Sequence, residues 1–162
     1  MDYAPDYYQK ATLILGCGNI LFGDDGFGPA VIEYLQEHCR VPASAAAIDV
    51  GTGVREILFN IILTENKPQR IVIVDALDCN RKPGDIFNVS IEEIPIKKIH
   101  DFSVHLMPTL NMLKELRDLC HVEVVVLAGQ PEKIPEAVKL GLSPQMQKAV
   151  PKISEYIVQN YF

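Results

Sequence analysis

The sequence predicts an α/β protein in which a twisted, mostly parallel sheet of about five strands lies between two helical layers, a three-layer α/β/α fold. Short runs of aliphatic and β-branched residues alternate along the chain with longer segments whose apolar residues recur at helical spacing. The strand-like runs also lack polar alternation, which is typical of parallel strands covered on both faces.

The chain has the length and composition of one soluble domain. Its 162 residues are 48% hydrophobic and 22% charged, and a chain of this size buries roughly 70% of its unfolded surface. We expect a single domain over residues 1–162, with residues 1–10 as a flexible N-terminal extension. That extension is acidic and tyrosine-rich and does not resemble a signal peptide.

Charge and cysteine content restrict the partners and the compartment. The formal net charge of −6 argues against nucleic acid or an anionic membrane as the main partner. The four cysteines show no C-x-x-C spacing, so we expect neither a structural zinc site nor a disulfide framework. Free thiols and the lack of a membrane-spanning stretch indicate a cytoplasmic protein, and nothing in the sequence requires more than a monomer.

The first predicted elements are a buried strand, a glycine-rich loop and a helix. The strand covers residues 12–15, and the loop carries two adjacent acids, Asp24 and Asp25. An amphipathic helix starts near Pro29, because proline suits the first helical turn. Ligands bind at the carboxyl ends of strands in open α/β sheets, so this loop is the first place to look for a site.

The middle of the chain predicts two strands, a helix between them and an edge strand. Residues 45–50 form the second strand, and residues 70–75 form the third, which ends in an acid. The helix between them, residues 54–63, is capped by Thr52, and its continuous apolar residues indicate deep burial. Residues 85–89 are expected to add an edge strand that can run antiparallel.

The last part of the chain predicts two helices around one strand. A helix spans about residues 104–119, with leucines on its apolar side, and a buried strand covers residues 122–127. The final helix begins at Ser143 and Pro144. Pro151 should kink or split this helix, because proline removes a backbone hydrogen bond inside a helix.

Three polar residues are expected at one end of the sheet. Asp25 follows the first strand, Asp75 ends the third, and His105 starts the helix that comes later. If the first and third strands are neighbours, as in flavodoxin-like sheets, Asp25 and Asp75 share one crevice. Two carboxylates and an imidazole suit a borderline divalent metal such as nickel or zinc.

Structural explanations for the same residues remain open at this point. Asp75 could cap a turn, and Asp49 could form an Asx-turn before Gly51. His105 could be exposed or structural. The pair Asp24-Asp25 could interact with a helix dipole.

The segment Gly16-Cys-Gly-Asn-Ile-Leu-Phe-Gly-Asp-Asp-Gly-Phe-Gly28 resembles the N-terminal signature of the hydrogenase maturation proteases. These enzymes trim a C-terminal extension from the large subunit of nickel–iron hydrogenases once nickel has been inserted. Further matching segments follow in the same order: Asp49-Val-Gly-Thr52, Val74-Asp75-Ala76, Ser103-Val-His105 and Leu127-Ala-Gly-Gln-Pro131. The resemblance covers nearly the whole chain and implies a hydrogenase large-subunit precursor as the partner.

The resemblance also implies which residues bind metal. The metal-binding positions of the family fall on Asp25, Asp75 and His105, the three residues already expected in the crevice. Many members carry glutamate at the position of Asp25, and the shorter aspartate must reach the metal from closer backbone. The Asp-Asp-Gly-Phe-Gly version looks like the branch that serves hydrogenases reducing the deazaflavin coenzyme of methanogens.

The expected mechanism follows from the motifs that are present and absent. The sequence has neither a G-x-S-x-G elbow nor an H-E-x-x-H motif, so a serine protease or a conventional zincin is unsupported. Cys17 directly follows the first strand and is expected to pack there, although His105 could serve it as a base. We expect nickel to arrive with the substrate and to polarise the scissile carbonyl or activate water. Asp49 is the candidate to position that water.

Two other functions start from the same residues. A Rossmann-type nucleotide binder would need a third glycine where Leu21 stands, and the acid pair would repel a pyrophosphate. A receiver-like signalling domain would accept phosphate on Asp75, but it would need a lysine where Gly129-Gln130-Pro131 ends the last strand. Tight NAD or FAD binding would support the first, and phosphorylation of Asp75 would support the second.

Overall fold

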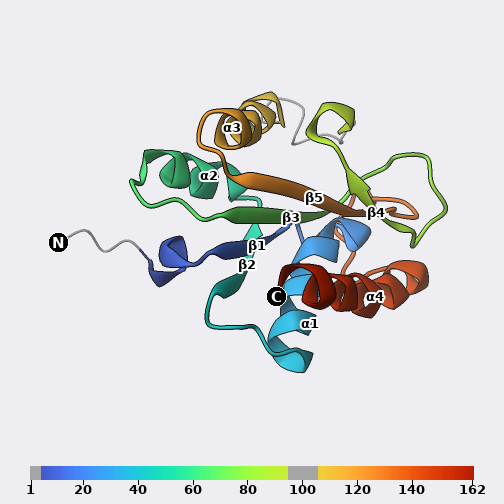
Figure 1. The fold of residues 1–162 in the computed structure, drawn as a ribbon. Helices are drawn as coiled ribbons and strands as arrows, with labels where there is room; N and C mark the ends of the chain where they lie inside the picture. The colour runs from blue at the N-terminus through green and yellow to red at the C-terminus, as the bar shows by residue number, and fades with distance from the viewer. Residues whose placement is uncertain (1–4, 95–105) are drawn as a thin grey trace.

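The computed structural model describes residues 5–94 and 106–162. Its strands are β1 (Thr12–Cys17), β2 (Ala45–Gly51), β3 (Arg70–Ala76), β4 (Ile86–Val89) and β5 (Glu123–Gly129). Its helices are α1 (Phe27–His38), α2 (Val54–Leu63), α3 (Leu106–Asp118) and α4 (Pro144–Tyr161), with short 3-10 helices η1 (Asp6–Gln9), η2 (Gly23–Gly26) and η3 (Ile91–Glu93). Helices α1 and α4 cover one face of the sheet and α2 and α3 cover the other, which confirms the predicted three-layer fold (Figure 1).

The sheet has five strands in the order β2-β1-β3-β5-β4. Strands β1, β2, β3 and β5 run parallel, and β4 is an antiparallel edge strand, as predicted. Strand β1 lies between β2 and β3, with Gly16 opposite both Asp49 and Val74. The prediction that the first and third strands are neighbours is therefore confirmed. Strand β2 lies on one side of β1 and the later strands lie on the other, so the topological switch point of the sheet is between β1 and β3.

The two faces of β1 pack into two separate apolar layers. Leu13 and Leu15 join the cluster under α2 and α3, whereas Ile14 joins the cluster under α1 and α4. All three side chains are fully buried. The absence of polar alternation in this strand is thus explained by cover on both faces.

The beginning of α1 lies unusually close to the sheet. A Cβ atom on Gly28 would stand 2.5 Å from the carbonyl oxygen of Val74, and one on Gly16 would stand 2.5 Å from the carbonyl oxygen of Gly28. Only glycine at both positions permits this approach. It holds the acid-bearing loop between β1 and α1 against the carboxyl ends of the strands.

Two expected features of the helices are corrected by the structure. Helix α2 begins after Gly53 rather than being capped by Thr52. It is also not buried on all sides, since Phe59 and Leu63 are exposed while Val54, Leu58 and Ile61 face the sheet. A helix in an outer layer covers the sheet with one face only, which explains the difference.

Helix α4 begins at Pro144, with Ser143 at the N-cap position, as predicted. It runs without interruption to Tyr161, so Pro151 does not split it. Five of its buried side chains lie in the apolar layer shared with α1, and packing along this face stabilises the helix on both sides of the proline.

The N-terminal segment differs from the expected flexible extension as far as it is described. Residues Asp6–Gln9 form η1, and the Tyr8 side chain is 7% exposed and belongs to the apolar layer with α2 and α3. Burial of an aromatic ring fixes this segment on the domain.

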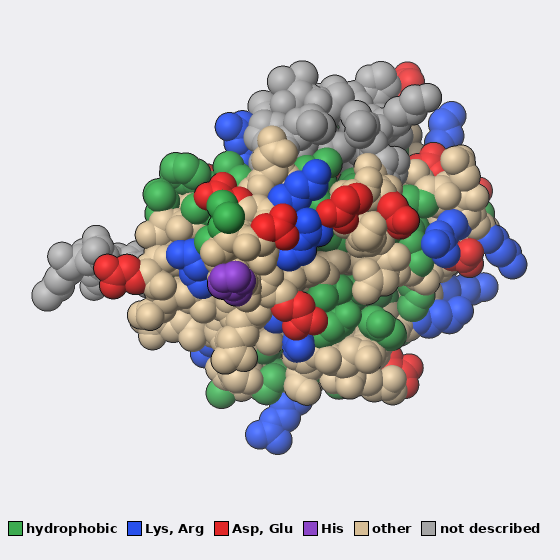
Figure 2. All heavy atoms as spheres, turned by 45° about the horizontal axis from the view of Figure 1, so that its top comes forward, with side chains coloured by type: hydrophobic (Ala, Val, Ile, Leu, Met, Phe, Trp, Pro, Cys, Tyr) green, Lys and Arg blue, Asp and Glu red, His purple; other side chains and the backbone are tan. Residues whose placement is uncertain are grey.

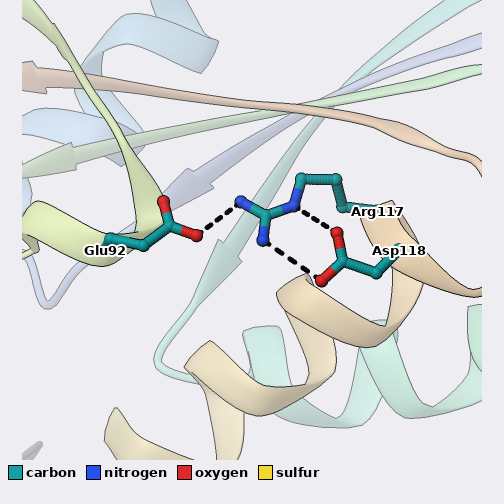
Figure 3. A network of polar contacts seen from close by, with 3 residues as sticks. All are labelled: Glu92, Arg117 and Asp118. Atoms are coloured by element: carbon teal, nitrogen blue, oxygen red, sulfur yellow. Dashed lines mark hydrogen bonds and ion pairs between the residues drawn. The ribbon is translucent and has the colours of Figure 1, made fainter.

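An exposed ionic cluster joins η3 to the end of α3. The Arg117 guanidinium donates to Glu92 at 2.8 Å and to Asp118 at 2.7 Å (Figure 3). Hydrogen bonding to Arg117 lowers the pKa of both carboxyl groups. Acidic and basic side chains are intermixed on the molecular face shown in Figure 2, where no large patch of a single sign stands out.

Candidate functional site

The two adjacent acids of the glycine-rich loop have different surroundings. Asp24 is buried, and its Oδ1 accepts the backbone N–H of Ser143 at 2.7 Å. Its Oδ2 accepts the backbone N–H of Glu132 and the hydroxyl of Ser143, both at 2.9 Å. Asp24 therefore anchors Ser143, the N-cap residue of α4, and the loop before it.

Asp25 lies at the end of the sheet. Its side chain is 8% exposed, and Oδ2 accepts the backbone N–H of Asn19 at 2.9 Å. Gly18 adopts φ +137°, and a Cβ there would overlap the carbonyl oxygen of Asp25. The Gly18 N–H donates to the carbonyl of Gly51 at 2.9 Å, which ties the loop to the end of β2. The loop thus wraps closely around Asp25.

Asp75 occupies the end of the central strand β3. Its Oδ1 accepts the backbone N–H of Ala76 at 2.8 Å, and its side chain is 9% exposed. It lines a small, largely apolar cavity of about 40 Å³ together with Cys17 and Thr109. η2, which carries Asp25, packs against β3, which carries Asp75. The two predicted aspartates are thus placed on contacting elements.

His105, the third predicted ligand, lies outside the described residues. Helix α3 starts at the next position, and Thr109 of this helix shares the cavity with Asp75. Within the part of the chain that the structure describes, no three His, Cys, Asp or Glu side chains are grouped as a metal site. A three-ligand centre built on the two aspartates therefore needs a donor from elsewhere.

Asp49 lies on the opposite side of β1 from Asp75. It is exposed, and its Oδ1 accepts the Gly51 N–H at 2.9 Å, which is the Asx-turn that the sequence left open. It also lines an open groove of about 430 Å³ beside α1. The Sγ of Cys17 lies 3.8 Å from the carbonyl oxygen of Leu15 in the buried end of β1, so this thiol packs as expected.

The sequence reasoning missed Gln130, which organises the loop after β3. Its side chain is 4% exposed and makes four hydrogen bonds. Oε1 accepts the N–H groups of Cys79 and Arg81, at 2.9 and 3.1 Å. Nε2 donates to Asp78 at 2.9 Å and to the Pro131 carbonyl at 3.1 Å. The only sequence signal was a glutamine directly after the strand end, inside the Leu127–Pro131 segment.

Electrostatics in this loop follow from the same contacts. The hydrogen bond from Gln130 lowers the pKa of Asp78, and the backbone N–H of Asn80 adds to the effect. Burial raises the pKa of the Cys79 thiol. Asp78 therefore stays ionised and Cys79 stays a neutral thiol near neutral pH, as expected for loop residues that hold structure.

An open α/β/α sheet with buried aspartates beside its switch point is the arrangement in which α/β proteins commonly bind ligands. Comparison with known proteins identifies the family. A sequence model of the hydrogenase maturation protease family matches residues 29–160. The chain belongs to this family and is a hydrogenase maturation endopeptidase.

The chain matches its relatives over nearly the whole length of both sequences. The chain is 38% identical to MJ0253 of Methanocaldococcus jannaschii, named as a candidate hydrogenase maturation protease, over 93% of this chain and 96% of that protein. It is 35% identical to the coenzyme F420 hydrogenase subunit delta of Methanothermobacter thermautotrophicus, over 93% and 94%. The crystal structure of the hydrogenase 3 maturation protease superposes with a TM-score of 0.73 at 25% identity, covering 90% and 88%.

Family membership favours the protease over the nucleotide-binding and receiver-like alternatives. Among the described residues, no helix combines the length and apolar character needed to span a bilayer.

Proposed function

We propose that this endopeptidase removes the C-terminal extension of a nickel–iron hydrogenase large-subunit precursor after nickel insertion. In this proposal Asp25, Asp75 and His105 recognise the nickel ion, which belongs to the substrate. The supporting observation is the placement of two buried aspartates on η2 and β3, elements that pack together at the carboxyl edge of the sheet. Similarity to a coenzyme F420 hydrogenase subunit supports a precursor from the deazaflavin-reducing branch.

The donor chemistry fits a nickel ion. Carboxylate oxygens with an imidazole suit a borderline metal. Asp24 is unsuited to this role because three protein donors already occupy its two oxygens. His105 precedes α3 by one position, and Thr109, four positions further on, lines the cavity beside Asp75. This spacing supports His105 as the third ligand.

The cleavage chemistry is divided between the nickel carried by the substrate and residues of this chain. Substrate-bound nickel supplies Lewis acidity at the scissile carbonyl or at a water molecule. Asp49 is proposed to position the attacking water, because it is exposed and lies two residues before the end of β2, where Gly51 is bonded to the Asp25 loop. All four cysteines are free, which supports action in the reducing cytoplasm, and we propose that the enzyme acts as a monomer.

The test compares nickel-loaded and nickel-free precursors as substrates. Purified protein should trim only the loaded form, with the product identified by mass spectrometry. Asp25→Asn, Asp75→Asn and His105→Ala should remain folded and lose trimming by about a hundredfold or more, because each change removes a proposed ligand of the substrate's nickel. Asp118→Asn, which changes an exposed aspartate of α3, serves as the matched control.

Two results would contradict the proposal. Equal trimming of the nickel-free precursor would remove the role of the metal. Normal trimming by the His105→Ala variant would remove this residue from the recognition set.

A further inference from the structure

We infer that an open groove beside the candidate site binds a stretch of the precursor polypeptide that carries a basic side chain. The inference rests on the proposed function and names how the substrate chain is held. The groove has a volume of about 430 Å³ and lies between α1 and the loops that contain Ile20 and Leu142. Glu33 and Gln36 line it from α1, and Asp49 lines it from the end of β2.

The groove adjoins the loop that carries Asp25. Ile20, which lines the groove, directly follows Asn19, whose N–H binds the carboxylate of Asp25. Gly26, the residue after Asp25, also lines the groove. A polypeptide lying in the groove therefore lies against the Asp25 loop and beside Asp49, the residue proposed to position the attacking water.

The charges of the groove indicate the chemistry of its occupant. Its charged lining residues are Glu33 and Asp49, both exposed, and no Lys, Arg or His belongs to the described lining. Within the described residues Glu33 forms no ion pair or side-chain hydrogen bond. Two unneutralised acids favour a Lys or Arg side chain on the partner. Ile20 is 59% exposed at one wall, which suits an apolar neighbour of that basic residue.

The walls of the groove are fixed before any substrate binds. The N–H of Lys139 donates to the Leu21 carbonyl at 2.9 Å, and the N–H of Gly23 donates to the Lys139 carbonyl at 2.7 Å. These bonds join the two loops that form one wall, and Asp24 anchors the same loops to α4. A preformed groove loses little conformational entropy on binding.

The side chain of Gln36 limits how the segment can bind. Its Nε2 donates to the carbonyl oxygen of Ala47 at 2.8 Å, on the edge strand of the sheet. This contact blocks strand addition along the middle of β2. The incoming segment is therefore directed to the end of the groove near Asp49 and Ile20.

The experiment measures trimming kinetics of the full chain on nickel-loaded precursor. Glu33→Gln should raise KM about fivefold with little change in kcat, since one charge contact contributes roughly this much to affinity. Glu37→Gln is the matched control, because Glu37 is exposed on the same helix one turn away and does not line the groove. It should behave as wild type.

A variant of the precursor completes a double-mutant cycle with Glu33→Gln. The trimmed product shows which bond of the precursor is cleaved. The Lys and Arg residues of the precursor within about ten positions of that bond are then changed to Gln, because an extended segment of this length could lie in the groove. This precursor should raise KM for wild type and remove the difference between wild type and Glu33→Gln.

The outcomes separate the inference from the proposed function. If wild type trims the precursor and Glu33→Gln has the KM of Glu37→Gln, the groove inference is overturned and the proposed function stands. If Glu33→Gln raises KM equally for both precursors, a basic partner is overturned. If wild type trims no nickel-loaded precursor, the proposed function fails and the inference falls with it.

Discussion

Asp24 and Asp25 are chemically identical neighbours, and their roles are set by where the backbone directs them. Asp24 points to the start of α4 and accepts three hydrogen bonds from residues far away in sequence. Asp25 accepts a bond from its own loop at the end of β1. The short η2 helix turns the two side chains apart, because successive residues of a 3-10 helix point about 120° from each other. One acid therefore anchors the fold, and the other lies at the end of β1 beside the candidate site.

This division predicts opposite behaviour for two substitutions. Asp24→Ala leaves two partly buried backbone N–H groups and the Ser143 hydroxyl without their acceptor, so it should lower the free energy of unfolding by about 3 kcal/mol. Asp25→Asn keeps an acceptor for Asn19 and should change stability by less than about 1 kcal/mol. Urea unfolding followed by circular dichroism measures both. Equal stability of the two variants would show that Asp24 does not anchor the loop.

At the level of elements, the loop after β3 is held by the end of β5. Gln130 binds three residues of that loop, and the loop follows directly on Asp75. The Gly84 N–H also donates to the Gln130 carbonyl at 2.9 Å. The loop is thus fixed to the sheet through one glutamine, which in turn limits the motion of the strand end that carries Asp75.

Removing this glutamine should be visible in the titration of Asp78. Gln130→Leu keeps the side-chain volume but removes the amide donor, so the pKa of Asp78 should rise towards its ordinary value. The shift is measured by NMR titration of the carboxyl carbon. Gln36→Leu, which removes an amide on the other side of the sheet, should leave this pKa unchanged. An unaltered Asp78 pKa in Gln130→Leu would contradict the assigned contact.

The sequence predicted the regular elements because they depend on local patterns. The run of residues 70–75 lies in the central strand and the Ser143-Pro144 pair starts α4, as expected from composition and proline geometry. The bounds of α2 were predicted correctly, but its N-cap position is occupied by Gly53 rather than by Thr52. No periodic pattern marks Tyr8, whose burial depends on residues distant in sequence.

The candidate site was predictable only where it depends on local sequence patterns. Strand ends and adjacent acids identified Asp25 and Asp75, and the structure places both on contacting elements. The separation of Asp24 from Asp25 depends on contacts with Ser143, more than a hundred residues away, and Gln130 acts through a loop that follows a different strand. Such pairings exist only in the folded chain, so sequence spacing does not reveal them.

On the scale of the whole molecule, the two ends of the sheet carry different features. The carboxyl ends of the strands carry the aspartates and the groove. At the opposite end, Arg70 of β3 pairs with Glu123 of β5 at 2.6 Å and lies 5.2 Å from the ring centre of Tyr161. The last turn of α4 thereby closes the amino ends of the central strands. Changes at this end should alter stability and leave trimming intact.

The arrangement predicts a loss of stability in alkali that depends on Tyr161. Burial raises the pKa of Tyr161 to about 12, with further contributions from Tyr156 and Glu123 that the nearby Arg70 opposes. In the unfolded chain a tyrosine has a pKa of about 10. Because the folded chain holds this proton more tightly, the stabilisation is complete below pH ~10 and is lost as the pH rises towards ~12. Tyr161→Phe removes this proton, so its stability should fall less steeply than that of wild type over the same range. Thermal melting at a series of pH values measures the slopes, and the ultraviolet absorbance of the phenolate follows the ionisation.

Tyr7 has a pKa raised in the same way and lies at the other end of the chain. Tyr7→Phe should therefore flatten the dependence of stability on pH independently, and the two effects should add in the double variant. Parallel slopes for wild type and Tyr161→Phe would show that the ring at the end of α4 is not held against the sheet in solution.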